Sequence, residues 1–359
     1  MDATKAKYRF EPDYAVAPGE TLGETLESLG MTQAELAMRT GLDKVSVNRI
    51  INGSQPITFE TANKLELATG VPAGFWNNLE AQYRAQLARL DERAQLEKDL
   101  DWLKTIPVKE LVKRKVIPAE KDRAVLLRHV LGFYGTSTVK AWHEYWQAKA
   151  IAARRSQAIK SHQGPTSAWI RLGELQAQTL QCQPYDKGRF TVALRNIRAM
   201  TVETPNSFIP KMRQQCADAG VAMSLVPEFK GAPWYGATKW LTPVKAMILL
   251  CLRGKREDQF WFSFFHEAGH VLNDSKKDLF INDGSSDDPC EQKANEFAST
   301  ILVPPDRQQE VAALSTKAQI RQLAEELGIA PGIVVGQYQH MTRNFKWFND
   351  LKRTFIWND

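Results

Sequence analysis

Two histidines and a glutamate stand within five residues in the segment FFHEAGHVLND, at residues 264–274. His266 and His270 are four residues apart, and in a helix this spacing places both imidazoles on one face, where they can hold one metal ion. Glu267 lies beside them, placed to take a proton from a water that the metal activates. The residues from Phe260 onward are apolar on all sides, which predicts a buried helix. An H-E-x-x-H string arises by chance in roughly one such sequence in a hundred or fewer. The segment therefore predicts a zinc-hydrolase helix.

A catalytic zinc site needs a third protein ligand and leaves one position open. The acidic candidates downstream are Asp274, Asp278, Asp283, Asp287, Asp288, Glu291 and Glu296. In the segment DDPCEQKANEFASTILVP, Asp288 can cap a helix that begins at the following proline. Glu291 then shares the inward stripe of Ala294 and Ala298, whereas Glu296 lies on the far face. A glutamate at this third helical position can also complete a capping box. We favour Glu291 as the third ligand, because the cap is an aspartate and the stripe is the buried one.

Apolar runs flanked by glycine and proline, at residues 220–227 and 244–252, predict strands of a small antiparallel sheet. FWFSFFHEAGH, the E-x-x-A-N-x-F-A string that starts at Glu291, and the LVP after it resemble the ImmA/IrrE family of metallopeptidases, over roughly residues 216–340. The resemblance implies a zincin-like α+β domain, Zn2+ as the metal, Glu267 as general base, and protein substrates that are often Xre-type repressors. We further expect a peptide to pair with the edge of the sheet, taken as the strand at residues 244–252.

The N-terminal part predicts short capped helices. TLGETLESLG is an amphipathic helix that ends at its glycine. Thr32 and Glu35 form a capping box that starts a second helix, QAELAMRT, and Gly41 ends that helix. Asp43 can cap a third helix, KVSVNRII. Two short helices separated by a glycine turn are typical of a helix-turn-helix.

Residues 18–83 resemble the HigA/VapI-type antitoxin branch of the lambda-repressor-like (Xre) family, through PGETL, TQAELAMRTGL, VNRIINGSQPIT and GFWNNLEAQY. The resemblance implies operator DNA as a partner and a homodimer formed through this domain. It places four side chains in the major groove and one beside a phosphate: Lys44, Ser46, Asn48 and Arg49, and Gln33. Such bundles also serve as dimerisation modules alone. Residues 1–97 carry 10 Lys and Arg against 14 Asp and Glu, so binding to DNA would be weak unless a dimer or the basic middle contributes.

The remaining composition predicts three parts in an ordinary globular chain of 359 residues, 43% hydrophobic and 25% charged. They are residues 1–97 (helix-turn-helix domain with a connector helix), 98–215 (a basic all-helical spacer) and 216–359 (the metallopeptidase domain). The middle part carries 21 Lys and Arg against 9 Asp and Glu, either as a surface for a polyanion or as a solvated helical face. Its aromatics Trp142, Tyr145 and Trp146, at helical spacing, predict either packed core or a base-stacking stripe.

Localisation is predicted from what the sequence lacks. The first twenty residues contain no apolar run, and the longest apolar stretch, AMILLCL, is far shorter than the ~20 residues of a membrane helix. The four cysteines form no C-x-x-C pair, as expected of reduced thiols in a cytoplasm. We expect a cytoplasmic protein with no membrane partner.

The sequence as a whole predicts a mainly α protein with a lambda-repressor-like helix-turn-helix bundle, a helical middle and a C-terminal α+β domain. The expected function is a DNA-binding regulator or antitoxin whose zinc-dependent endopeptidase domain cleaves a regulatory protein, either a partner or the chain itself. An alternative is an antitoxin-type repressor that neutralises a cognate toxin by binding, with a silent, structural or sensory zinc site. A third hypothesis is that the chain is a zinc hydrolase that acts on a non-peptide bond.

Overall fold

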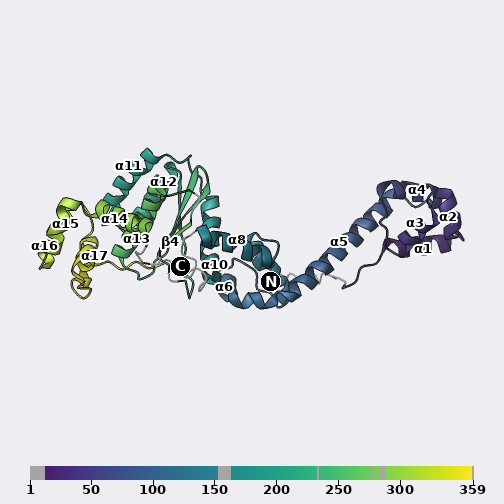
Figure 1. Ribbon diagram of the computed structural model, residues 1–359, viewed down its shortest axis with the longest axis horizontal. Helices are drawn as coiled ribbons and strands as arrows, with labels where there is room; N and C mark the ends of the chain where they lie inside the picture. Colours follow the sequence, from purple (N-terminus) through teal and green to yellow (C-terminus); the bar gives the residue numbers. More distant parts are fainter. Residues whose placement is uncertain are drawn as a thin grey trace, which may run out of the picture. The chain divides into compact units, whose positions relative to one another are not determined.

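The computed structural model describes residues 13–152, 163–232, 234–276, 279–282, 284 and 288–357. The chain forms two compact units, Met1–Leu100 with Asp122–Val125 and Asp101–Lys121 with Leu126–Asp359 (Figure 1). Each unit has an apolar core of its own. Within the described ranges, no helix is both long enough and apolar enough to cross a bilayer.

The first unit is a bundle of helices. They are α1 (Pro18–Ser28), α2 (Gln33–Thr40), α3 (Lys44–Ile51), α4 (Phe59–Thr69) and α5 (Ala73–Lys98). Apolar side chains from all five helices meet in one buried cluster around Trp76, with Leu22 and Leu36 fully buried. α2 and α3 are the expected pair of short helices, and α3 packs against both α1 and α2. The burial of Val47 and Ile50 fixes which face of α3 is turned to the core and which is left to solvent.

The helix ends of this pair follow local side-chain chemistry. The Thr32 hydroxyl accepts a hydrogen bond from the Glu35 amide at 3.1 Å, and Gly41 ends α2 at φ 69°, where glycine is unstrained. Asp43 accepts a bond from the Ser46 amide at 2.8 Å and so caps α3. The expected capping box is half formed, because the Glu35 carboxylate binds Arg39 one turn later. An i,i+4 partner of opposite charge therefore takes the place of the backbone amide.

The second unit is helical around a four-stranded sheet. Before the sheet come α6 (Val108–Lys113), α7 (Arg123–Tyr134), α8 (Val139–Ala152), α10 (Gln163–Thr179), α11 (Lys187–Ala199) and α12 (Pro205–Asp218), with 3-10 helices η1 (Leu100–Thr105) and η2 (Met200–Val202). The strands are β1 (Val221–Leu225), β2 (Gly236–Thr242), β3 (Lys245–Leu250) and β4 (Leu279–Asn282). The other helices are α13 (Glu257–Asn273), α14 (Pro289–Leu302), α15 (Pro305–Ala312), α16 (Lys317–Leu327), α17 (Pro331–Thr342) and η3 (Asn349–Leu351).

The aromatic side chains of α8 belong to a packed core. Trp142 and Trp146 are buried, and the ring of Trp142 lies edge-on to that of Trp102, with centroids 5.0 Å apart. Edge-to-face packing of this kind is typical of a core and leaves no ring face for a base. Of the predicted stripe, only Tyr145 is exposed.

The sheet is mixed, with strand order β1-β3-β2-β4. β2 pairs antiparallel with both β3 and β4, but β1 pairs parallel with β3. The expectation of an antiparallel sheet is therefore wrong for β1, and the strand at residues 244–252 is not an edge, because β3 is paired on both sides. A tight hairpin places β3 beside β2, and β1 then lies against the outer side of β3 in the same direction. The strand order could not be predicted from the sequence. β1 and β3 are both short apolar runs, and such runs do not show which strand pairs with which or in which direction.

Helices cover both faces of the sheet. Ser224 of β1 donates to the Gly173 carbonyl of α10 at 3.0 Å, so α10 packs on one face. Ile248 and its cross-strand partner Thr238 point to the other face, where α13 packs against β2 and β3. Figure 1 shows the strands between α10 and the α12–α13 pair. Coverage on both faces accounts for the almost continuous burial of β3.

Candidate functional site

One helix carries the H-E-x-x-H residues into the core of the second unit. α13 is buried along most of its length, and the side chains of His266, Glu267 and His270 are at most 1% exposed. The Nε2 atoms of His266 and His270 lie 3.1 Å apart on one face of the helix. The buried helix and the shared face of the two imidazoles are as the sequence predicted.

A second helix brings Glu291 to the histidines. The Asp288 side chain caps α14 by accepting from the Cys290 amide at 2.7 Å, and Glu291 follows one residue later on the buried side. Its carboxylate oxygens lie 3.0 Å from His266 Nε2 and 3.6 Å from His270 Nε2. α14 approaches α13 closely, because a Cβ on Gly269 would lie 3.3 Å from the backbone of Ala294. The carboxylate thus faces the imidazoles across a tight helix–helix contact.

These three side chains fit a zinc ion. Among the residues that the structure describes, His266, His270 and Glu291 form the one group of three potential ligands, all within 4.8 Å of one another. Tetrahedral ligands about 2.0–2.2 Å from zinc are about 3.3–3.6 Å apart, close to the 3.0, 3.1 and 3.6 Å found here. Two imidazoles and one carboxylate are also the donor set of many catalytic zinc sites.

The outer nitrogens of both imidazoles are held by acceptors. Nδ1 of His266 lies 2.8 Å from Oδ1 of Asn295, and Nδ1 of His270 lies 2.7 Å from Oδ2 of Asp274. A carboxylate or an amide oxygen only accepts hydrogen bonds, so each Nδ1 carries a proton, and Nε2 is the nitrogen of each ring that presents a lone pair once it is deprotonated. The two Nε2 atoms and the Glu291 carboxylate face one point, and this arrangement suits a cation bound between them.

Electrostatics around the cluster favour positive charge. Burial lowers the pKa of His270, but hydrogen bonds to Asp274 and Glu291 outweigh burial and raise that pKa to about 9. Burial raises the pKa of Glu291, but hydrogen bonds from both histidines outweigh it and lower that pKa to about 2. Without a metal the cluster would therefore hold a proton as its positive charge, and a divalent cation can replace that proton.

Glu267 is set apart from the three ligand candidates and is held by strand β2. The Thr238 hydroxyl lies 2.7 Å from Glu267 Oε2, whereas Oε1 is buried with no hydrogen-bond partner among the described residues. Strand and carboxylate touch because residue 236 is glycine; a Cβ there would lie 2.5 Å from Oε1. Burial raises the pKa of Glu267 above its usual value, against the lowering effect of His266, His270 and Thr238. A raised pKa and a free oxygen suit a group that takes up and returns a proton.

The other acidic candidates have different positions. Asp274 orients His270 rather than joining the three ligand atoms, Asp288 caps α14, and Glu296 is exposed. Asp278, Asp283 and Asp287 lie outside the described residues. Asp274 and Asn295 were missed as orienting groups, although each stands four residues after a site residue: Asp274 follows His270 directly after the end of α13, and Asn295 follows Glu291 on α14. Thr238 was missed because nothing local to β2 shows which helix the strand will face.

We expect removal of the Asp274 carboxylate to weaken zinc binding. Without it the His270 ring loses the acceptor that fixes its orientation and raises its basicity, and such losses typically cost 10–100-fold in metal affinity. Asp274→Ala should therefore raise the zinc Kd by about 10–100-fold in a chelator competition titration. Asp306→Ala, which removes an exposed carboxylate on α15, is the matched control. An unchanged Kd for Asp274→Ala would contradict this role.

The five predicted DNA-contact residues lie on the first unit. Gln33 opens α2, and the other four lie on α3. Gln33, Lys44, Asn48 and Arg49 are exposed. Ser46 is half-buried, and its hydroxyl donates to Asp43 at 2.6 Å, so the helix cap already uses it. The Asn48 side-chain oxygen accepts from Asn52 at 2.9 Å.

The fold and the site define a helix-turn-helix protein with a peptidase-like domain of the H-E-x-x-H kind. Residues 22–76 match the helix-turn-helix family, and residues 230–335 match the family described as the IrrE N-terminal-like domain, peptidase M78. The chain thus carries a helix-turn-helix domain followed by an IrrE N-terminal-like, M78 peptidase-like domain. The second match contains all four side chains of the candidate zinc site.

Two solved structures are similar to part of the chain. One is an addiction module antidote protein of a HigA family from Coxiella burnetii, 32% identical over 24% of this chain and 94% of that chain, with a TM-score of 0.22. The other is antitoxin HigA from Pseudomonas aeruginosa with the higBA promoter, 28% identical over 24% of this chain and 95% of that chain, with a TM-score of 0.23. No curated protein matches the chain significantly.

Proposed function

We propose that this chain is a DNA-binding transcriptional regulator of the antitoxin kind whose second unit is a zinc-dependent endopeptidase that cleaves a regulatory protein, either a partner or the chain itself. The convergence of His266, His270 and Glu291, with Glu267 beside them, carries the proposal. The match of residues 230–335 to a peptidase family supports it.

Zinc would be held by Nε2 of His266, Nε2 of His270 and the carboxylate of Glu291. When bound, it supplies Lewis acidity, which polarises a peptide carbonyl and makes a water acidic enough to attack at neutral pH. Asn295 and Asp274 keep the two imidazoles in the tautomer that binds metal.

The proton steps belong to Glu267. Its free Oε1 takes a proton from the attacking water and returns it to the leaving amine, so the carboxylate ends each cycle as it began. The Thr238 hydroxyl holds Oε2 and thereby the plane of the carboxylate. An extended peptide would pair with β4, the strand at the end of the sheet on this side. Phe280 of β4 stacks on the His270 ring at 4.2 Å, which places the strand beside the site.

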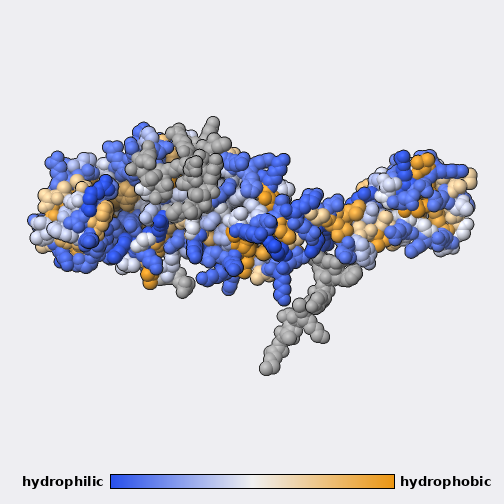
Figure 2. All heavy atoms as spheres, turned by 60° about the horizontal axis from the view of Figure 1, so that its bottom comes forward, coloured by the Kyte–Doolittle hydropathy of each residue, from blue (hydrophilic) through white to orange (hydrophobic). Residues whose placement is uncertain are grey.

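The first unit would bind operator DNA through α3. Lys44, Ser46, Asn48 and Arg49 are proposed to meet the major groove, with Gln33 at a phosphate. A homodimer would supply two such helices and offset the acidic balance of the unit. Large apolar side chains of the unit are exposed, among them Met38, Phe59 and Leu67, and they suit an interface with a second copy. Figure 2 shows such apolar surface on the unit.

Arg49→Ala should weaken binding to the operator. An arginine at a base edge contributes about 1–3 kcal/mol, so a loss of roughly 10–100-fold is expected. The assay is fluorescence anisotropy at fixed salt, with a duplex from upstream of the protein's own gene. Lys64→Ala on α4, which removes a cation paired with Glu60, should bind as the wild type does. Equal losses for both variants would argue against readout by α3.

Co-expression with the product of the neighbouring gene tests the peptidase. Wild type should convert that protein, or its own chain, into two fragments whose masses sum to the parent plus one water. Glu267→Gln should leave both proteins intact. Unchanged masses with wild type, or the same fragments with Glu267→Gln, would count against the proposal.

A second candidate function is toxin neutralisation by binding, with a silent, structural or sensory zinc site. It is favoured by the burial of all four site residues, none more than 3% exposed. If the chain acts by binding, the Glu267→Gln variant should still neutralise the toxin, and a chain without the first unit should not. Under the peptidase proposal, Glu267→Gln abolishes the effect.

A further inference from the structure

Arg213 on α12 is a partly desolvated cation without a counter-ion. Its side chain is half-buried, and among the described residues it forms no ion pair and no hydrogen bond. Burial lowers the pKa of its guanidinium below the usual value, since no anion nearby offsets the loss of water. Other arginines of the unit are satisfied: Arg198 reaches three backbone carbonyls, and Arg353 binds Glu257. A half-buried guanidinium without a partner has lost part of its hydration, and an anion beside it would offset that loss.

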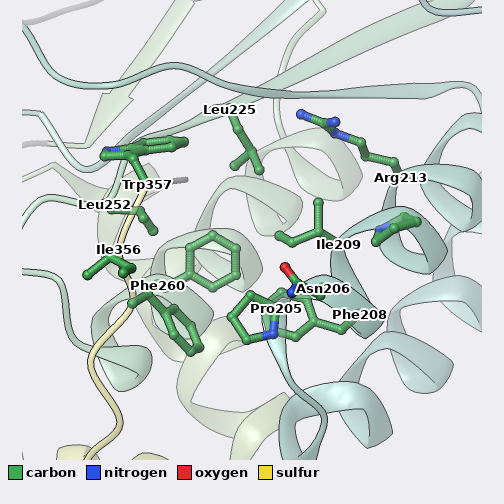
Figure 3. A pocket seen from close by; sticks show the side chains of 12 residues that line it. Pro205, Asn206, Phe208, Ile209, Arg213, Leu225, Leu252, Phe260, Ile356 and Trp357 are labelled. Atoms are coloured by element: carbon green, nitrogen blue, oxygen red, sulfur yellow. The ribbon is translucent and has the colours of Figure 1, made fainter. Parts of the chain in front are cut away.

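The Arg213 side chain lines a pocket that is otherwise largely apolar. The pocket has a volume of about 570 Å³, and its walls include Phe208, Ile209, Leu225, Leu252 and Phe260. Figure 3 shows Arg213 at one side of the pocket and Trp357 and Ile356 at the other. Pockets that bind small molecules have roughly this volume, mostly apolar walls and few polar groups.

The far wall of the pocket is anchored by hydrogen bonds. The chain after η3 passes the start of α13, where the Phe355 amide donates to the Lys255 carbonyl at 2.8 Å and the Glu257 amide donates to the Arg353 carbonyl at 3.1 Å. Arg353 also binds the Glu257 carboxylate, which is fully buried. Phe355 then packs against Phe208 and Phe260, with centroids 5.8 and 5.6 Å apart. The wall that carries Phe355 is therefore held in place by the fold.

This pocket is distinct from the zinc ligands. Phe260 precedes His266 by six residues, about 9 Å along the helix axis. His266, Glu267, His270 and Glu291 are absent from its lining.

We propose that this pocket is a binding site for a small carboxylic acid with an apolar body, whose carboxylate pairs with Arg213 and whose body lies against Phe208, Leu252 and Phe260. A guanidinium binds a carboxylate through two parallel hydrogen bonds, and the apolar walls exclude water from the pair. The site is independent of the proposed peptidase activity.

Isothermal titration calorimetry of the full chain with octanoate tests the site. Octanoate should bind saturably with one molecule per chain. Acetate has the charge without the apolar body, and 1-octanol has the body without the charge; each should bind at least about tenfold more weakly.

Two variants separate recognition from folding. Arg213→Gln should weaken octanoate binding by about 10–100-fold, whereas Arg195→Gln, at an exposed arginine of α11, should bind as the wild type does. Ile209→Trp keeps Arg213 but fills the pocket from the same helix, and this variant should abolish octanoate binding. Far-UV circular dichroism checks the fold of each variant, and Ile209→Trp decides the question if Arg213→Gln does not fold.

Three results would overturn the proposal. They are the absence of saturable octanoate binding to wild type, octanol binding as tight as octanoate, and undiminished binding in folded Arg213→Gln or in Ile209→Trp.

Discussion

Glu267→Gln is expected to lower kcat/KM for peptide cleavage by about a thousandfold or more while zinc stays bound. A positioned acid–base group contributes roughly 10²–10⁴-fold, and an amide cannot take up the proton of the attacking water. Glutamine has nearly the shape of glutamate and can keep a hydrogen bond to Thr238, so the fold and the ligands should be preserved. Cleavage of a peptide library, followed by mass spectrometry, and zinc content of the same sample measure both effects.

The matched control for this variant is Glu296→Gln, which makes the same change at an exposed position of α14. It should cleave as the wild type does. If Glu267→Gln cleaved at the wild-type rate, Glu267 would have no part in proton transfer. If it lost zinc together with activity, its role would be structural.

Glu291→Gln is expected to remove zinc from the protein. The carboxylate is the one anionic ligand of the cluster, and both its oxygens face the imidazoles at 3.0 and 3.6 Å. Loss of a side chain that only orients a metal ligand typically costs 10–100-fold in metal affinity. Loss of the ligand itself should therefore lower the zinc affinity by at least about a hundredfold. The Kd follows from competition with a chromogenic chelator, and Glu296→Gln on the same helix should retain wild-type affinity.

A second observable separates loss of the ligand from unfolding. Glu291→Gln should keep its far-UV circular dichroism spectrum, since Ala294 and Ala298 still hold α14 against the core. Wild-type zinc affinity in the folded variant would exclude Glu291 as a ligand and return the choice to the other acidic side chains.

The helix that carries the histidines could be predicted because the residues that define it are neighbours in the sequence. Spacing alone puts His266 and His270 on one face, and the apolar run from Phe260 shows that the face is buried. Asp288 and the buried stripe of Ala294 and Ala298 in the same way fix the direction in which Glu291 points. These features depend on one helix at a time, and helical periodicity is a property of the sequence itself.

Features that join distant segments could not be predicted. The parallel pairing of β1 with β3 depends on how the chain crosses between strands, and this makes β3 an interior strand. The contact between Thr238 and Glu267 requires knowing that β2 lies under α13. The capping box at Thr32 is only half formed, and the reason is local, because Arg39 competes for the Glu35 side chain.

The most direct test of a His-His-Glu zinc centre is the zinc K-edge X-ray absorption spectrum of the purified full chain, with zinc quantified in the same sample. We predict one zinc per chain, with nitrogen and oxygen neighbours at about 2.0–2.2 Å and the outer-shell scattering of two imidazoles. A spectrum with sulfur neighbours at about 2.3 Å, a spectrum without imidazole scattering, or a protein that takes up no zinc would contradict the account.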